Sequence, residues 1–177
     1  FYSEVVGNIE KHVRDEGIAV ELAGTNNQPE VEQRLLATIL AEERVAGIVL
    51  ISTPGPHHFE EIPTDVPLVT VDHCPPELEG KCVSITCDNF AGGHSAAIHL
   101  ASLGHERVGY INVPYGSPHR LEGFRKGFEE HGIELGEEWV MTLESAWHIE
   151  AEVLSFVARL ELTALASVND MIAMQAM

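Results

Sequence analysis

Apolar residues recur along the chain at two spacings that alternate. Apolar residues at every third or fourth position predict amphipathic helices, whereas short continuous apolar runs predict buried strands. Helices are expected at residues 5–16, 31–43, 91–103, 120–130, 149–160 and 170–177. Strands are expected at residues 18–22, 46–51, 67–72, 83–86, 107–113, 139–143 and 164–168. This alternation predicts an α/β fold with parallel sheets that are covered on both faces and joined by right-handed crossovers.

The alternation restarts after Gly104, which follows a predicted helix and precedes a fresh strand. We therefore predict an N-terminal lobe at residues 1–104 and a C-terminal lobe at residues 105–177. Both lobes lack elements that such sheets normally have. A parallel strand would ordinarily precede the helix that starts near Phe1, and the second lobe has few strands for a sheet of this kind. We expect a fragment whose first strand is missing and whose second lobe is incomplete.

The chain is acidic, since 10 lysines and arginines oppose 28 aspartates and glutamates and the net charge is −18. A polyanion is repelled by this charge, so these residues are not expected to bind nucleic acid themselves. The three cysteines, Cys74, Cys82 and Cys87, show no CxxC spacing. This spacing argues against a disulfide framework or a zinc site and fits reduced thiols in a cytoplasm. No apolar run is long enough to cross a bilayer, so no membrane partner is expected.

Polar side chains follow the predicted strands, at the edge where open parallel α/β sheets bind ligands. These residues are Ser52, Asp72, His73, Asp88, Asn89, Arg120, Asn169 and Asp170. The aromatic residues expected beside them are Phe1, Tyr2 and Trp147. Asp, Asn and Arg side chains bind vicinal hydroxyl groups, and an aromatic ring offers a flat apolar surface to the C–H face of a sugar. The combination is typical of a polyol site.

Structural roles compete with ligand binding at several of these positions. Asp72, Asp88 and Asp170 also suit turns or helix N-caps, because aspartate caps helices well. Arg120 could be a solvated residue of a first helical turn. The helix macrodipole disfavours a cation there, so a counter-ion from ligand or protein would explain it. Trp147 could pack in the core instead of stacking on a ligand.

No motif supports an enzyme or a bound cofactor. The chain has 10 histidines, but they form no HExxH and no paired Cys/His spacing, so no metal site is expected. Residues 92–96 differ from GxSxG, and no P-loop or GxGxxG follows a predicted strand. We therefore predict a binding protein that uses no cofactor.

A series of short motifs follows in an order that is typical of one protein family. The motifs are FYSE at 1–4, RVAGI at 44–48, VD at 71–72, DNFAG at 88–92, LASLGHERVGYI at 100–111, RLEGF at 120–124 and NDMIAM at 169–174. With these motifs the chain resembles the lactose-repressor (LacI) family along essentially its whole length. The resemblance implies two Rossmann-like lobes of the type I periplasmic-binding-protein kind. It also implies a helix-turn-helix head, absent from this sequence, that binds operator DNA as a dimer and responds to a small effector between the lobes.

The resemblance assigns roles to the candidate residues. Arg120 matches the arginine that binds the effector, Asp72 an aspartate at the end of a first-lobe strand, and Asn169 a polar contact from the second lobe. Apolar or aromatic walls of the site are matched by Phe1, Tyr2 and Trp147. Matches that rest on strand-end position more than on residue type are Ser52, His73, Asp88 and Asn89.

The resemblance therefore implies the effector-binding core of a cytoplasmic, homodimeric transcriptional regulator, with a sugar as the expected effector. A purine effector is an alternative, because Phe1 and His73 could contribute to an aromatic sandwich. An exported sugar-binding protein that serves an ABC transporter is a second alternative. We expect dimer contacts on the apolar parts of residues 2–16, 31–43 and 170–177.

Overall fold

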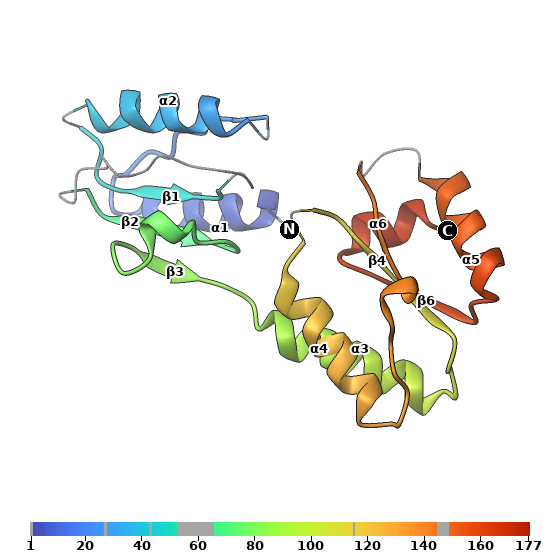
Figure 1. The fold of residues 1–177 in the computed structure, drawn as a ribbon. Coiled ribbons are helices and arrows are strands. Elements are labelled where there is room, and N and C mark those ends of the chain that lie inside the picture. The colour runs from blue at the N-terminus through green and yellow to red at the C-terminus, as the bar shows by residue number, and fades with distance from the viewer. Residues whose placement is uncertain (1, 27, 43, 53–65, 115, 145–148) are drawn as a thin grey trace. The chain divides into compact units, whose positions relative to one another are not determined.

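The computed structural model of the chain describes residues 2–26, 28–42, 44–52, 66–114, 116–144 and 149–177. The chain divides into two compact units, Phe1–Cys87 and Asp88–Met177 (Figure 1). Each unit has its own parallel sheet, in agreement with the α/β pattern. The division differs from the boundary expected at Gly104. Helix α3 (Asn89–Ser102) belongs to the second unit, because it packs along helix α4 (Pro118–Glu129).

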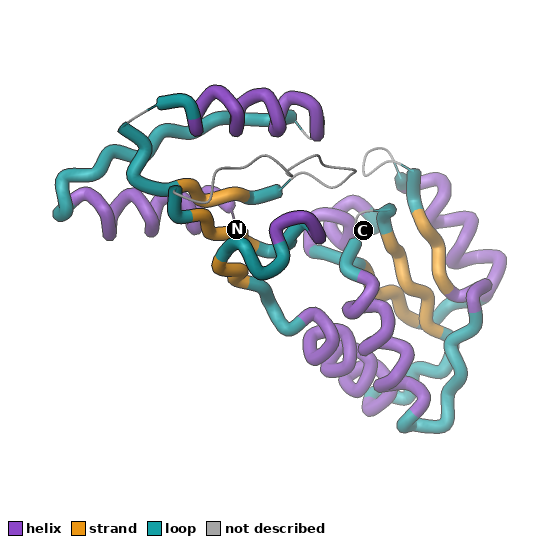
Figure 2. The backbone as a smooth tube through the Cα atoms, turned by 60° about the vertical axis from the view of Figure 1, so that its left-hand side comes forward, coloured by secondary structure: helices purple, strands orange, loops and turns teal. Residues whose placement is uncertain are grey.

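The first unit is built on a three-stranded parallel sheet with the order β1-β2-β3. Its strands are β1 (Ile48–Leu50), β2 (Leu68–Val71) and β3 (Val83–Ile85). Among its described residues, the elements that accompany these strands are α1 (Tyr2–Arg14), α2 (Pro29–Leu40) and the 3-10 turn η2 (Pro76–Leu78). The backbone trace in Figure 2 shows the short strands of this unit between its two long helices.

Opposite faces of the first sheet pack against different helices. Leu50 and Leu68 are buried together with Leu36 of α2. Val49 and Val69 lie on the other face, where they line a cavity with residues of α1. Successive residues of a strand point to opposite faces, so a continuous apolar run supplies both layers.

The strand expected at residues 18–22 does not form. Residues 18–25 contain neither helix nor strand, although Ile18, Val20 and Leu22 are large apolar residues at alternate positions. An extended segment becomes a strand only when the backbone of a neighbour pairs with it. Among the described residues, the ladders of the first sheet join β1, β2 and β3 alone.

The second unit also has a parallel sheet, with β4 (Val108–Asn112) between β5 (Val140–Thr142) and β6 (Ala164–Ser167). The remaining elements are η3 (Glu137–Trp139), α5 (Glu150–Leu160) and α6 (Asp170–Gln175), besides α3 and α4. Val108 and Ile111 of the central strand are completely buried. The main hydrophobic core of this unit forms around β4.

Helices cover both faces of β4 (Figure 1). On one face the ring of Tyr110 contacts the ring of Phe124 of α4, with the centroids 5.0 Å apart. On the other face Gly109 has no room for a side chain, because a Cβ there would lie 2.6 Å from the ring of Phe156 of α5. A glycine within the apolar run therefore lets α5 pack closely on the sheet.

Glycines also bring the backbones of α3 and α4 into contact. A Cβ on Gly93 would overlap the carbonyl group of Arg120, and a Cβ on Gly123 would overlap the carbonyl group of Phe90. Both glycines are buried between the two helices. The motifs at 88–92 and 120–124 are therefore held together directly through the backbone.

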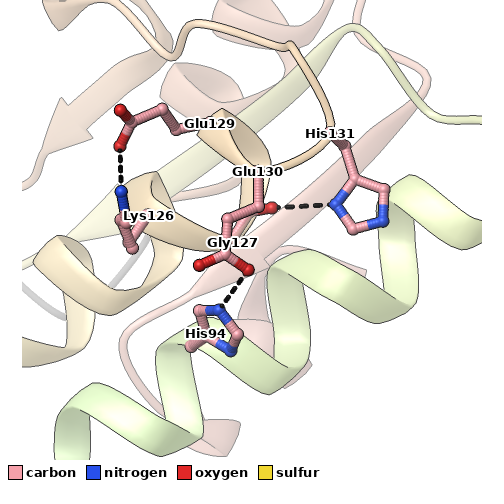
Figure 3. Close-up of polar contacts among 6 residues, drawn as sticks. All are labelled: His94, Lys126, Gly127, Glu129, Glu130 and His131. Atoms are coloured by element: carbon pink, nitrogen blue, oxygen red, sulfur yellow. Dashed lines mark hydrogen bonds and ion pairs between the residues drawn. The ribbon is translucent and has the colours of Figure 1, made fainter.

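Polar side chains join the same helices farther along their length (Figure 3). His94 of α3 donates through Nε2 to Oε2 of Glu130, the C-cap residue that follows α4, at 3.0 Å. His131 donates through Nδ1 to the carbonyl oxygen of Gly127 at 3.0 Å and closes the last turn. These bonds are partly or fully exposed, so they orient the helix ends more than they stabilise them.

Within the described residues, no helix combines the length and apolar character that a bilayer crossing requires.

Candidate functional site

Arg120 joins three elements at the strand-end edge of the second unit. It lies in the first turn of α4, after Pro118, whose ring is well suited to the start of a helix. The guanidinium donates from one terminal nitrogen to the carbonyl oxygen of Val168, which follows β6. The other terminal nitrogen donates to Oδ1 of Asn89, the first residue of α3. The structure thus brings two of the predicted site residues, Arg120 and Asn89, into direct contact.

The two acceptors of Arg120 are both neutral. The counter-ion expected for this arginine is not found within the described residues, where Arg120 takes part in no ion pair. The side chain is partly buried, and burial of a cation without an anionic partner is unfavourable. Its position in a first helical turn is also unfavourable for a cation, because the helix dipole favours anions there. Arg120 is therefore a positively charged group that a polar or anionic ligand would stabilise.

Asp88 and Asn169 serve as helix N-caps. Oδ1 of Asp88 accepts a hydrogen bond from the backbone N–H of Ala91 at 2.8 Å. Oδ1 of Asn169 accepts one from the N–H of Ile172 at 2.9 Å. The capping role considered for Asp88 is confirmed, and Asn169 has the same role at α6. Each cap leaves its other polar side-chain atom for further contacts.

Asp170 begins α6, and its Oδ1 accepts a hydrogen bond from the N–H of Met171 at 2.9 Å. The residue is exposed, and a carboxylate in a first helical turn is favoured by the helix dipole. These contacts are sufficient to explain an aspartate at this position.

Tyr110 and Asn112 are polar residues of the buried strand β4 that the sequence pattern did not identify. Both side chains point to the face of β4 that α4 covers, because alternate residues share a face. Tyr110 Oη and Asn112 Oδ1 are buried and have no hydrogen-bond partner within the described part of the chain. Burial raises the pKa of Tyr110, and the nearby charge of Arg120 partly offsets that rise. The available signal was a polar residue at every second position of an otherwise buried strand.

Tyr2 and Asp72 form a second contact between predicted site residues, within the first unit. Tyr2 Oη donates to Asp72 Oδ2 at 2.8 Å. Burial, the hydrogen bond to Asp72 and the charge of Asp72 together raise the pKa of Tyr2 to about 12. Asp72 itself adopts φ 72°, in the left-handed region that non-glycine residues rarely occupy. The backbone turns sharply at Asp72, directly after β2.

The other candidates of the first unit differ in their surroundings. Ser52 is buried, and its hydroxyl donates to Oε1 of Glu32, a buried residue of α2, at 3.0 Å. This bond orients Ser52 toward the helix layer, and Glu32 is a further buried polar residue that the pattern did not identify. His73 is exposed and makes no hydrogen bond within the described residues. Phe1 and Trp147 lie outside the described residues.

A cavity of about 430 Å³ lies between α1 and the first sheet. Apolar side chains form most of its lining, including Val5, Ile9 and Ile85, and Asp72 stands at its border. The predicted polar residues therefore form two groups, one around Tyr2 and Asp72 and one around Arg120. Each group lies within one compact unit. That both groups contact one ligand stays a prediction.

Comparisons with known proteins show which family the chain is similar to. The family described as periplasmic binding proteins and sugar binding domain of LacI family matches residues 1–177. The HTH-type transcriptional regulator DegA of Bacillus subtilis (strain 168) is 29% identical over 185 residues, which cover 98% of this chain and 53% of the relative. The HTH-type transcriptional repressor PurR of Actinobacillus pleuropneumoniae serotype 5b (strain L20) is 28% identical over 145 residues, which cover 79% of this chain and 42% of the relative.

The fold agrees with solved structures as well. A crystal structure of a protein described as a ribose operon repressor, from Burkholderia thailandensis, aligns with a TM-score of 0.81 and 26% sequence identity. The alignment covers 99% of this chain and 66% of that protein. The chain spans about half the length of the curated relatives that it matches. DegA is named as a transcriptional regulator and PurR as a transcriptional repressor.

Proposed function

This chain belongs to the family of periplasmic binding proteins and LacI-type sugar binding domains, and we propose that it is the effector-binding part of a transcriptional regulator. In this proposal a small polar effector binds at the strand ends, with Arg120 as the principal contact. Binding changes the affinity of the complete protein for operator DNA. The family is one of binding proteins, and the proposal includes no catalytic step.

The observation that carries the proposal is the environment of Arg120. Two neutral acceptors, the side chain of Asn89 and the carbonyl oxygen of Val168, fix the direction of the guanidinium. Within the described residues they leave its charge without an anionic partner, and a guanidinium has further N–H donors beyond the two used here. A planar donor group held in this way is suited to bind adjacent hydroxyl groups or a carboxylate in a bidentate manner.

A sugar is the effector class that we propose. Oδ2 of Asp88 and Nδ2 of Asn169 are the polar atoms that the two helix caps leave available, beside the donors of Arg120. Together they offer an acceptor and donors, as a polyol requires. The relative from Burkholderia thailandensis described as a ribose operon repressor supports a sugar, whereas the purine repressor relatives keep a nucleobase as the alternative.

The proposed regulator is cytoplasmic and homodimeric, and a part of the protein outside this chain binds the DNA. The net charge of −18 supports a separate DNA-binding part, because the chain itself would repel DNA phosphates. The relatives named as HTH-type regulators favour this reading over a transporter's sugar-binding protein. Met171 and Met174 of α6 are 45% and 65% exposed and are candidates for the dimer contact. A monomer in sedimentation of the complete protein at micromolar concentration would contradict the dimer.

A thermal-shift panel tests the effector class. Monosaccharides, disaccharides and nucleobases are added separately to the protein at concentrations from micromolar to millimolar. A ligand that binds only the folded state raises the melting temperature in proportion to the logarithm of its concentration. We expect at least one sugar to do so. If a nucleobase and no sugar raises the melting temperature, the effector is a purine and the proposal of a sugar is wrong. If no compound raises it, an effector site of either class is contradicted.

A further inference from the structure

Cys74 and Cys82 lie side by side in the first unit, with their Sγ atoms 3.8 Å apart. Cys74 follows β2, and Cys82 directly precedes β3, so the pair closes the connection between two adjacent parallel strands. The sulfur atoms are at about van der Waals distance, and nothing in the proposed effector site accounts for their pairing.

The connection between the two cysteines is held in place by its own packing. Leu78 of η2 is 1% exposed and belongs to the core cluster against which both cysteines pack. Cys82 Sγ donates to the carbonyl oxygen of Leu78 at 3.4 Å, and Gly80 supplies the left-handed turn with φ 74°. The two thiols therefore face each other because the backbone between them is fixed.

We propose that Cys74 and Cys82 form a reversible dithiol–disulfide pair, a modification site that responds to a peroxide. A disulfide bond is about 2.05 Å long, so the sulfurs must approach by roughly 1.8 Å from 3.8 Å, which side-chain rotation can provide. Both side chains are only partly buried, so a small oxidant has access to them. The site is independent of Arg120 and of the effector.

The reaction balances with hydrogen peroxide as the oxidant. One cysteine thiolate attacks a peroxide oxygen and the O–O bond breaks, which gives a sulfenic acid and a hydroxide ion. The hydroxide takes up the proton that the thiol released and becomes water. The second thiol then attacks the sulfenic sulfur, the S–S bond forms, and a second water leaves. Two thiols are oxidised and one peroxide is reduced to two waters. A small dithiol reductant reverses the change by thiol–disulfide exchange.

The environment sets the conditions under which the pair reacts. Burial raises the pKa of the Cys74 thiol, and the neighbouring Cys82 acts in the same direction, although a hydrogen bond with Thr70 opposes them. Because the thiolate is the reactive form, oxidation is expected to be slow at neutral pH and faster in alkaline solution. The disulfide would tether the segment that begins two residues after Asp72, whose side chain accepts the hydrogen bond from Tyr2.

The test uses the whole chain and its Cys87→Ser variant, in which Cys74 and Cys82 are the only cysteines and therefore the only residues that can form a disulfide. After treatment with hydrogen peroxide, we expect the intact mass of this variant to fall by two hydrogens and to return after reduction. Trypsin cuts after Lys81, between the two cysteines, so the disulfide should link residues 45–81 to residues 82–107. Cys74→Ser and Cys82→Ser in the same background are the matched controls and should give no linked peptide.

Other outcomes would overturn the proposal. One is that the Cys87→Ser variant keeps both thiols, or gains only oxygen atoms, under conditions in which a surface thiol is oxidised. Another is that the wild-type chain links Cys82 to Cys87 while the variant forms no disulfide. Thermal melts of each serine variant in the reduced state establish that the variant is folded, so a missing cross-link is not the result of unfolding.

Discussion

A methyl group added to Gly93 tests the packing that positions Arg120. Gly93 lies in the middle of α3, and its Cβ would overlap the carbonyl group of Arg120 and lie 3.0 Å from the backbone nitrogen of Phe124. A backbone carbonyl cannot rotate away, so α3 and α4 must separate. The neighbouring Gly92 is exposed on the same helix, and its Cβ would meet no atom within 4 Å. Gly92→Ala is therefore the matched control.

The expected magnitudes follow from two opposing effects. Replacing glycine by alanine in a helix interior stabilises the helix by about 0.5–1 kcal/mol, and this gain applies to both variants. Overpacking of a buried contact costs about 1–3 kcal/mol, and this cost applies to Gly93→Ala alone. We expect the free energy of unfolding to rise slightly in Gly92→Ala and to be lower by about 1–3 kcal/mol in Gly93→Ala than in the control.

Urea unfolding followed by tryptophan fluorescence measures the difference. Both tryptophans of the chain, at positions 139 and 147, belong to Asp88–Met177, so their emission reports on the unit that contains α3 and α4. Midpoints are compared at equal slope, because a change of slope would indicate a change in the surface exposed on unfolding. If Gly93→Ala unfolds at the same or a higher urea concentration than Gly92→Ala, the close helix contact is wrong.

Three further predictions use the same protein. Asp88→Ala removes the N-cap of α3 and should lower the free energy of unfolding by about 1 kcal/mol in the urea assay, and no change would contradict the cap. Tyr110→Phe removes a buried hydroxyl that has no partner within the described residues, so stability should be unchanged or higher, and a loss above about 1 kcal/mol would reveal a bond there. Tyr2 should titrate near pH 12 by ultraviolet absorbance. Because the pKa of Tyr2 in the folded protein, about 12, exceeds the ordinary tyrosine value of 10.0, the stability it contributes is present below pH 10.0 and is lost as the pH rises toward 12. In Asp72→Asn the pKa of Tyr2 should fall only in part, since burial is the largest cause.

The strands that the sequence predicted correctly have partners that complete their ladders. The runs around Val108 and Leu165 form the centre and one edge of the second sheet, where their backbone groups pair. Residues 18–22 show a similar local pattern but form no strand, because local pattern cannot specify whether a partner is present. The boundary was expected at Gly104 instead of between Cys87 and Asp88 for a related reason. The contact of α3 with α4 depends on glycines such as Gly93 and Gly123, whose missing side chains give no hydrophobic signal.

The candidate site could be predicted in part, from the rule that ligands bind beyond the ends of parallel strands. That rule selected Asn89 and Arg120 as strand-end residues of different lobes, whereas the structure joins them by a hydrogen bond within one unit. The rule could not distinguish helix capping from ligand contact at Asp88, because Oδ1 caps the helix whether or not Oδ2 contacts a ligand. Tyr110 was missed because it lies on β4 and Arg120 lies on α4. The two residues come close only when the helix packs on the strand, which the local sequence pattern does not show.

The central claim is that Arg120 contacts the effector. Isothermal titration measures the affinity of the best sugar from the thermal-shift panel for the wild-type chain, for Arg120→Ala and for Arg159→Ala, an exposed arginine of α5. Hydrogen bonds from a charged group contribute about 1.5–3 kcal/mol, so Arg120→Ala should weaken binding by at least about tenfold while Arg159→Ala binds as the wild type does. Tryptophan fluorescence establishes that both variants are folded. An unchanged affinity in folded Arg120→Ala would contradict the claim.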